Sequence, residues 1–374
     1  MVTRPSIGRV ESDQRRRAGV PDGGRTPRPG IARIAVDLLG GDESPAVVVD
    51  GALRAVQADP AVHLLLVGPV EAAGEVLAAL SPDDRGRVRV IGSLGRRPGS
   101  TGTAETPGST EAERPGSTGA VGRAGSTGAV GRPGNAGWIE SGVRAAVLAV
   151  AEGEADAVVS AGSTGATVTS AALGLGRWPG VRRPALAAVL PTATGRLVLL
   201  DVGATVDPDE RALLTQARLG VAYASVVHEL TAPRVGLLTI GTERGKGDRL
   251  RRAMPALLGD ARLPAGARYT GLVEGGDVVI GGGADVVVTD GFTGNILLKG
   301  LETAYARTAP PREGDVPPRA ATLLGVSGTV VVCHGAASGP DLAAGIALAA
   351  DLHRRGAVPA IAALMSEPEV IDEQ

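Results

Sequence analysis

Residues 285–299 read DVVVTDGFTGNILLK, an apolar run followed by a glycine-rich turn and a second apolar run. This order predicts a buried strand, a turn and the start of a helix. Unpaired backbone N–H groups at such a helix start can hold an anion. The stretch also contains the only Phe of the chain and one of its two Lys residues, Lys299. Because almost every other basic residue is Arg, a retained Lys indicates a position that needs a compact ammonium group.

Composition narrows the possible functions. The 374 residues are 43% hydrophobic but only 2% aromatic, which predicts a large core of Val, Leu, Ala and Ile. A net charge of −2 argues against a dedicated nucleic-acid binder, which usually carries a basic surface and stacking aromatic rings. The single Cys333 excludes an internal disulfide and a thiolate-cluster metal site. The chain has neither an apolar run long enough for a membrane span nor a signal-peptide core, so we expect a soluble, cytoplasmic protein.

Regular patterns are interrupted in two places. Residues 1–30 lack periodicity and predict a disordered N-terminal arm. Residues 93–137 repeat Gly-Ser-Thr and contain GSTGAVGR twice, which predicts a flexible, low-complexity insertion. We therefore expect one ordered α/β domain over residues 31–355, either as one elaborated sheet or as two lobes. A last helix is predicted over residues 341–352 and a C-terminal tail over 356–374.

Apolar runs alternate with helix-like segments along most of the chain. This alternation predicts a parallel sheet whose ligands lie at the carboxyl ends of the strands. The expected strands are residues 32–37, 62–67, 87–91, 156–160, 185–190, 196–201, 234–240, 285–288 and 329–332.

Small and polar residues follow several of these strands. The hexapeptide AGSTGA occurs at 124–129 and again at 161–166, but only the second copy lies between a strand and a helix, where it can cradle a phosphate. The candidate ligand-binding residues at the first and fourth strand ends are Asp37, Gly40, Gly41, Asp42, Ser160, Gly162, Ser163, Thr164 and Gly165.

Two glycine-rich segments are near misses of nucleotide-binding motifs. Residues 240–247 lack the Gly and the Ser or Thr of a Walker A loop, and Gly174-Leu175-Gly176 lacks the third Gly of a dinucleotide fingerprint. Neither an ATP nor an NAD site is supported. The four His residues have no ligand spacing, so we expect no metal and no cofactor.

Six short motifs, five of them containing Gly, occur in order along the chain. They are DLLGGD at 37–42, SAGSTGA at 160–166, RPA at 183–185, DVGA at 201–204, IGTE with KG at 240–247, and DVVVTDGFTGN at 285–295. On these motifs the chain resembles the PlsX-type phosphate acyltransferases from about Ile34 to Arg355, apart from the insertion. The resemblance implies a three-layer α/β/α fold with a mainly parallel sheet, like that of phosphate acetyltransferases.

The resemblance also implies a reaction and partners. Members of this family transfer a fatty acyl group from acyl carrier protein to inorganic phosphate, giving acyl phosphate for phospholipid synthesis. They are typically homodimers, and the family implies peripheral contact with a membrane acyltransferase. The chain departs from the family pattern at Ser163 and Thr205, where Asn is usual, and in the insertion. It is also shorter and richer in Pro over residues 300–321, where the family has long, partly apolar helices.

The same comparison, together with the chemistry of acyl transfer, predicts the site residues. Backbone amides of residues 162–165 and 291–295, with Lys246 or Lys299, are expected to bind phosphate, while Asn295 or an amide faces the oxyanion. His334 is expected either to protonate the leaving thiolate or to bind phosphate. The further predicted binding residues are Asp201, Asp290, Gly291, Thr293 and Gly294.

Some of the carboxylates must serve another purpose, because four of them around one phosphate would repel it. We expect some of Asp37, Asp42, Asp201 and Asp290 to cap loops or to orient basic side chains. Cys333 is expected to be a buried strand residue rather than a nucleophile. An acidic carrier protein needs a basic docking face, for which the candidates are Arg177, Arg182, Arg183, Arg249, Arg251 and Arg252.

Two other functions fit the same residues. A phosphate acetyltransferase-like enzyme would use a short acyl-coenzyme A on the same fold. Alternatively, a non-catalytic relative would bind acyl carrier protein or phosphate without chemistry.

Overall fold

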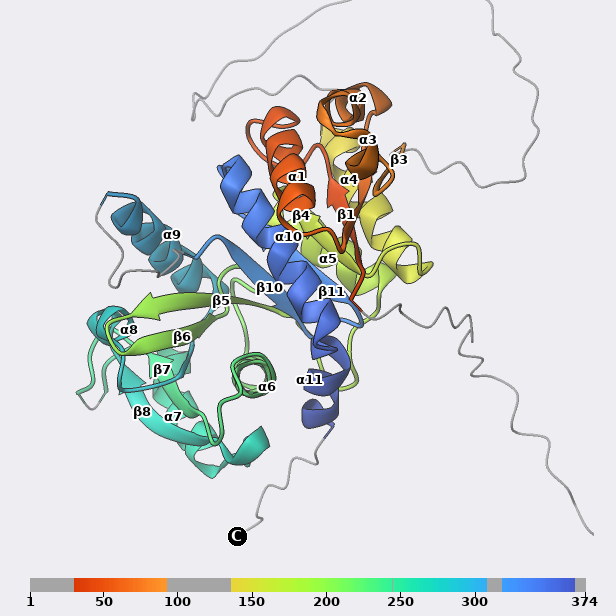
Figure 1. Ribbon diagram of the computed structural model, residues 1–374. Coiled ribbons are helices and arrows are strands. Elements are labelled where there is room, and N and C mark those ends of the chain that lie inside the picture. The colour runs from red at the N-terminus through yellow and green to blue at the C-terminus, as the bar shows by residue number, and fades with distance from the viewer. Residues whose placement is uncertain (1–29, 93–135, 244, 308–317, 367–374) are drawn as a thin grey trace, which may run out of the picture.

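The computed structural model of the protein describes residues 30–92, 136–243, 245–307 and 318–366 (Figure 1). Within them the strands form one eleven-stranded sheet in the order β3-β2-β1-β4-β11-β10-β5-β6-β9-β7-β8. The expected disordered arm and low-complexity insertion lie outside the described residues, except for Gly30 and the short stretch 136–137 that begins helix α4.

The sheet has two parallel halves joined by an antiparallel centre. In the first half, five strands are parallel: β3 (Val88–Ile91), β2 (Val62–Val67), β1 (Ala32–Asp37), β4 (Ala157–Ser160) and β11 (Thr329–Cys333). The joining strands β10 (Ala320–Leu324), β5 (Ala185–Thr192) and β6 (Gly195–Leu200) pair antiparallel in turn. In the second half, β9 (Val286–Val288), β7 (Arg234–Leu238) and β8 (Arg268–Val273) run parallel to β6.

The antiparallel centre reverses the strand direction between the two halves. Cys333 at the end of β11 pairs with Ala320 at the start of β10, whereas Leu200 at the end of β6 pairs with Ala187 near the start of β5. The carboxyl ends of β1, β4 and β11 therefore lie at one edge of the sheet, which we call the Ser160 edge. Those of β6, β7 and β9 lie at the opposite edge, called the Asp201 edge.

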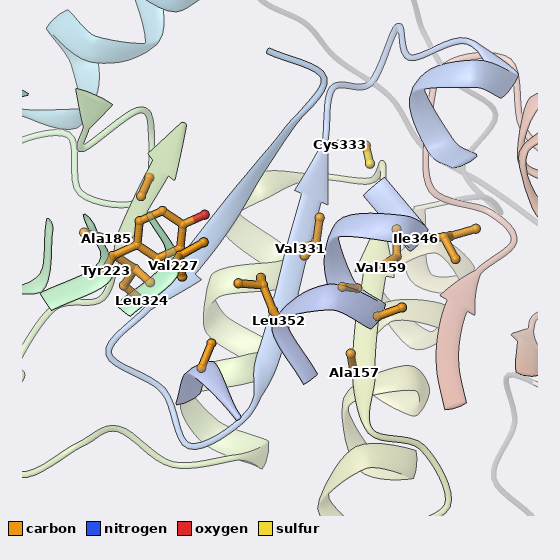
Figure 2. Close-up of a cluster of buried hydrophobic side chains, with 14 of the residues drawn as sticks. Ala157, Val159, Ala185, Tyr223, Val227, Leu324, Val331, Cys333, Ile346 and Leu352 are labelled. Atoms are coloured by element: carbon orange, nitrogen blue, oxygen red, sulfur yellow. The ribbon is translucent and has the colours of Figure 1, made fainter. Parts of the chain in front are cut away.

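Side chains on alternate positions of each strand enter two separate cores. Ile34 and Val36 belong to one buried cluster and Ala35 to the other, as the period of two along a strand requires. Figure 2 shows part of the first cluster, in which Val331 and Tyr223 lie among aliphatic side chains. Two cores separated by one sheet give the three-layer α/β/α fold, so the predicted fold class is confirmed.

Helices cover both faces of this sheet. The first core contains side chains of α1 (Ala46–Ala58), α2 (Val70–Ala79), α6 (Glu210–Val227), α7 (Arg249–Asp260), α10 (Gly339–Arg354) and α11 (Ala357–Met365). The second contains side chains of α4 (Ala136–Ala151), α5 (Thr164–Gly174), α8 (Gly275–Ile280) and α9 (Gly291–Arg307). The short α3 (Pro82–Arg85) leads into β3, and a 3-10 turn, Pro264–Gly266, precedes β8. Helices α5 and α9 thus lie over the same face.

The structure corrects several sequence-based expectations. Strands β8 and β10 were not predicted, and the place of the antiparallel strands in the mainly parallel sheet was not anticipated. The helix α11 (Ala357–Met365) lies within the predicted tail 356–374, so α10 is not the last helix. After Lys299, α9 continues to Arg307, beyond which residues 308–317 lie outside the described part. No helix within the described residues combines the length and apolar composition needed to cross a membrane.

Candidate active site

Loops after β1 and β4 meet at the Ser160 edge. The Ser160 hydroxyl donates a hydrogen bond of 3.0 Å to Asp37, and the Gly162 amide donates one of 3.1 Å to the Ser160 oxygen. A Cβ atom at Gly40 would lie only 2.7 Å from the Gly162 nitrogen, so the close approach of the two loops requires glycine. Burial raises the pKa of Asp37 to about 6, against its hydrogen bonds from Leu39 and Ser160. Asp37 is fully buried and holds the two loops together.

The first turn of α5 leaves three backbone amides available. Ser163 caps the helix by accepting a hydrogen bond from the Ala166 amide, and its carbonyl accepts the first helical bond from Thr167. Within the described residues, the amides of Ser163, Thr164 and Gly165 donate no hydrogen bond. Such amides, reinforced by the partial positive charge of the helix start, are suited to an anion such as phosphate.

The loop after β11 borders this turn region from the neighbouring strand. The Asp42 amide donates to the Gly335 carbonyl at 2.8 Å, which ties the β1 loop to the β11 loop. In the next residues, the Ala336 amide donates to His334 Nδ1 at 3.2 Å. Burial and the nearby Lys299 lower the pKa of His334 below its usual value, while Asp42 opposes the shift. His334 is therefore mostly neutral at pH 7.

Helix α9 brings two charged side chains from the second half of the sheet to the Ser160 edge. Glu302 Oε2 lies 3.9 Å from His334 Nε2, and Lys299 acts electrostatically on both groups. Farther along the helix, the Tyr305 hydroxyl donates to the Pro191 carbonyl at 3.1 Å. Burial raises the pKa of Glu302 to about 7, Asp341 adds to this, and Lys299 opposes it. The second half of α9, rather than its first turn, contributes to this edge.

At the opposite edge, Asp201 organises a loop by accepting backbone hydrogen bonds. Its carboxylate is fully buried and receives the amides of Leu186, Gly203, Ala204 and Thr205 at 2.6–3.0 Å. Burial raises the pKa of Asp201 to about 6, and the four amides oppose this shift. The expectation that some carboxylates cap loops is thus confirmed for Asp201.

The β9–α9 turn, which the sequence marks most strongly as an anion site, is occupied by the protein itself. Asp290 accepts the Thr293 amide through its side chain at 2.8 Å and the Gly294 amide through its carbonyl at 2.9 Å. The Gly291 amide donates to the Thr205 carbonyl at 2.8 Å. In addition, the Arg251 guanidinium pairs with the Asp290 carboxylate. These amides are therefore not free for phosphate.

The prediction that Arg251 belongs to a docking face is therefore wrong. Its side chain is only 8% exposed and lies between the carboxylates of Asp290 and Asp248. The Asp290 pKa is lowered despite burial, because Thr293 and Arg251 stabilise its charge. The Asn295 side chain donates to the Val202 carbonyl at 2.9 Å and so fastens α9 to the Asp201 loop.

Lys246 lies apart from Lys299. It follows β7 at the Asp201 edge, is about half exposed, and its ammonium is 3.9 Å from Glu243. No contact within the described residues joins it to His334 or Glu302. The predicted residues thus form two groups instead of one. The Ser160-edge group is Asp37, Gly40, Gly41, Asp42, Ser160, Gly162, Ser163, Thr164, Gly165, Lys299 and His334; the Asp201-edge group is Asp201, Lys246, Asp290, Gly291, Thr293, Gly294 and Asn295.

Two hollows lie near these groups. A basic, open hollow of about 810 Å³ is bordered by α5, by Thr205 and by three of the predicted docking residues, Arg177, Arg182 and Arg183. An apolar groove of about 500 Å³ runs beside the first turns of α9 and is lined by Phe292, Ile296, Leu297, Leu238 and Ile240, with polar groups at one end. The side chains of Phe292 and Ile296 are 59% and 57% exposed.

Sequence reasoning missed Glu302. The available signal was its position three residues after Lys299, which places both on neighbouring positions of the predicted helix. Cys333 is buried, and burial raises its pKa to about 12, so its interpretation as a strand residue is confirmed. Among the described residues, no group of three or more His, Cys, Asp or Glu side chains could hold a metal ion.

Solved structures resemble this fold. A crystal structure of a phosphotransacetylase from Streptococcus pyogenes gives a TM-score of 0.55 at 16% identity and covers 86% of this chain and 94% of that one. A branched-chain phosphotransacylase from Enterococcus faecalis gives 0.52 at 14% identity, covering 86% and 99%. At these identities the likeness concerns the fold, and it agrees with the predicted phosphate acetyltransferase-like architecture.

Sequence relatives identify the family. A family model described as "Fatty acid synthesis protein" matches residues 32–95 and 137–309. A phosphate acyltransferase from Thermobifida fusca is 38% identical over 347 residues, covering 85% of this chain and 87% of that protein. Another, from Desulforamulus reducens, is 34% identical over 374 residues and covers 92% and 100%. With matches of this extent, the chain belongs to the PlsX-type phosphate acyltransferase family of fatty acid synthesis proteins.

Proposed function

We propose that the protein transfers a fatty acyl group from the thioester of acyl carrier protein to inorganic phosphate, releasing acyl phosphate for phospholipid synthesis. Family membership gives the enzyme class, a phosphate acyltransferase. The carrier protein as donor, the fatty chain and the place in lipid synthesis are the proposed parts.

One observation supports the position of the reaction. The free amides of Ser163, Thr164 and Gly165 lie at the same edge as Lys299 and His334, whereas the Gly291, Thr293 and Gly294 amides of the β9–α9 turn are already bonded. An anion held by the α5 amides gains from the helix start and from the ammonium of Lys299. We therefore assign the phosphate to the Ser160 edge.

The chemistry needs no covalent enzyme intermediate. A phosphate oxygen attacks the thioester carbonyl, a C–O bond forms, and the C–S bond breaks with the electron pair leaving on sulfur. Amides and Lys299 stabilise the negative charge that moves onto the carbonyl oxygen. His334 either binds the phosphate or assists the thiolate. The buried Cys333 thiol, with its raised pKa, takes no part.

The apolar groove favours a fatty chain over an acetyl group. Phe292 and Ile296 line it, and they precede Lys299 by seven and three residues, so all three share one side of α9. A long acyl chain whose carbonyl lies near Lys299 can extend along this side into the groove. An acetyl group would leave the groove unused.

The basic hollow suits an acidic carrier protein. Arg177, Arg182 and Arg183 border it, and an acidic surface would be attracted to these guanidinium groups. The exposed Arg249 pairs with Glu210, and Arg252 donates to the Gly247 carbonyl. Because both already have partners in the protein, they are secondary candidates for the docking face. A homodimer, a cytoplasmic location and weak peripheral contact with a membrane acyltransferase are proposed from the family resemblance.

The test is a phosphate-dependent acyl transfer assay. Purified protein is incubated with palmitoyl-acyl carrier protein, palmitoyl-coenzyme A or acetyl-coenzyme A, with and without phosphate, and acyl phosphate is trapped with hydroxylamine. We expect product with the palmitoyl donors and most with the carrier protein. Product only with acetyl-coenzyme A would support the short-chain alternative. No product with any donor would leave the non-catalytic binding function.

A further inference from the structure

The pair formed by Glu302 and His334 has a geometry that the proposed function does not yet use. Glu302 belongs to α9 over the second half of the sheet, and His334 follows β11 in the first half. Their side chains approach to 3.9 Å and are 25% and 36% exposed. Both are therefore largely enclosed and still open to a bound substrate.

The hydrogen bonds of His334 fix which ring nitrogen carries the proton. The Ala336 amide donates to Nδ1, so Nδ1 must provide a lone pair. Neutral His334 then carries its hydrogen on Nε2, which faces Glu302. A neutral imidazole with this tautomer directs its Nε2–H toward Glu302, but it has no spare proton to give away.

The reaction requires a group that transfers one proton from phosphate to sulfur. Monohydrogen phosphate and a thioester give acyl phosphate and a free thiol, so the phosphate proton must finally reach sulfur. An alkyl thiolate is a poor leaving group unless an acid protonates it as the C–S bond breaks. A suitable acid has a pKa close to the working pH.

We propose that Glu302 is this acid and that His334 Nε2 holds it in place, an inference that rests on the proposed acyl transfer to phosphate. The Glu302 O–H bond breaks and an S–H bond forms as the thiolate leaves. The carboxylate, whose charge is stabilised by the His334 Nε2–H 3.9 Å away, then takes the proton of the phosphate hydroxyl and is restored.

The charges around Glu302 fit this cycle. Lys299 lies on α9, the same helix as Glu302, and Asp341 lies at the start of α10. His334 lies on the loop after β11, and Asp42 is a further charged neighbour of its imidazole. Burial and Asp341 raise the Glu302 pKa to about 7, so the carboxyl group is protonated below this pH and ionised above it. Lys299 limits the shift and stabilises the transient carboxylate.

The experiment compares two leaving groups. Glu302→Gln and wild type are assayed with palmitoyl-coenzyme A, whose alkyl thiolate needs an acid, and with a palmitoyl 4-nitrothiophenyl ester, whose thiolate leaves unaided. General acid catalysis is commonly worth about 10²–10⁴-fold. We expect Glu302→Gln to lose about 10²-fold or more with the first donor and less than about threefold with the second.

The pH profile is the second readout, measured with palmitoyl-coenzyme A alone. The wild-type kcat should fall as pH rises through about 7, where Glu302 loses its proton, and this alkaline limb should be absent in Glu302→Gln. Glu229→Gln, an exposed Glu near Arg355, is the matched control and should behave as wild type in both assays. Glu302→Asp should restore part of the lost activity.

Each result decides the proposal. Equal loss of activity with both donors, or an unchanged alkaline limb in Glu302→Gln, would overturn the assignment of Glu302 while leaving acyl transfer intact. Activity unaffected by the substitution would do the same. If wild type forms no acyl phosphate with these donors or with palmitoyl-acyl carrier protein, both the proposed function and this inference fail.

Discussion

The β4–α5 turn and the β9–α9 turn look alike as sequences but differ in the folded protein. Both follow buried strands, both are rich in Gly, and both begin a helix. At β4–α5 only Ser163 caps the helix, and three amides remain available. At β9–α9 the Asp290 carboxylate accepts the equivalent amide, that of Thr293, but the Gly291 amide is also taken, by the Thr205 carbonyl, and Asp290 adds a negative charge that Arg251 balances. One turn is open to a ligand, and the other is closed by the protein's own anion.

This difference teaches that a helix start marks an anion site only when no side chain already fills it. A capping carboxylate satisfies the same amides that would bind phosphate. The closed turn serves stability and places α9, while the open turn serves binding. Substitutions at the two turns should therefore affect different properties.

The largest effect is expected on stability from Asp290→Ala. This change removes a buried carboxylate, leaves Arg251 without its main partner and frees the Thr293 amide at the helix start. Breaking a buried ion pair typically costs about 3–5 kcal/mol. Urea unfolding should show this loss, whereas Asp209→Ala, which removes an exposed helix cap, should cost about 1 kcal/mol. A loss of 1 kcal/mol or less for Asp290→Ala would mean that the turn is not closed as described.

The next largest effect separates the two lysines. Lys299→Ala should lower kcat/KM for phosphate by about 10²-fold, because the ammonium stabilises negative charge at the Ser160 edge. Lys246→Ala, at the Asp201 edge, should change it less than about threefold, since the ammonium is exposed and screened. Steady-state acyl transfer at saturating donor measures both. The reverse ranking would move the reaction to the closed turn.

A smaller effect should follow from closing the open turn. Ser163→Asp places a carboxylate at the first turn of α5, which should raise the KM for phosphate about tenfold through charge repulsion. Stability should hardly change, because Asp caps a helix as well as Ser does. Ser163→Asn is the neutral control of similar size. If both variants keep the wild-type KM, phosphate does not bind at this turn.

The smallest effect concerns the apolar side of α9. Ile296→Ser should leave stability within about 0.5 kcal/mol, because this side chain is already exposed. It should reduce activity with palmitoyl donors relative to hexanoyl donors by about fivefold, as roughly 1 kcal/mol of apolar contact is lost. An unchanged ratio would show that the chain lies elsewhere. Leu173→Ser, at an exposed site on α5, is the control.

Local structure could be predicted well from the sequence, but the assembly of the site could not. The runs before Asp37, Ser160 and Asp201 are strongly apolar and were correctly assigned as strands. The hairpin between β5 and β6 also had a local signal, Thr192-Ala193-Thr194-Gly195, between two strand-like runs. The reversal of strand direction depends on β10 lying between β11 and β5, a long-range arrangement that no local pattern specifies.

The roles of individual side chains were hidden for the same reason. Arg251 and Asp290 are 39 residues apart, and only the packing of α7 against the sheet shows that they neutralise each other. Glu302 looked like an ordinary helix residue until α9 placed it against His334. Sequence motifs located the turns. Whether a turn binds a ligand or stabilises the fold depends on the side chains from distant segments that contact it.

Helix α9 extends over one face of the sheet from the Asp201 edge to the Ser160 edge. Its first turn is fastened at the Asp201 edge by Asp290 and Asn295, while Lys299 and Glu302 reach the Ser160 edge. At 1.5 Å per residue, Glu302 lies about 17 Å along the axis from Gly291. The hydrogen bond from Tyr305 to Pro191 fastens the far end as well, so the two anchors together set the distance between Lys299 and a phosphate on α5.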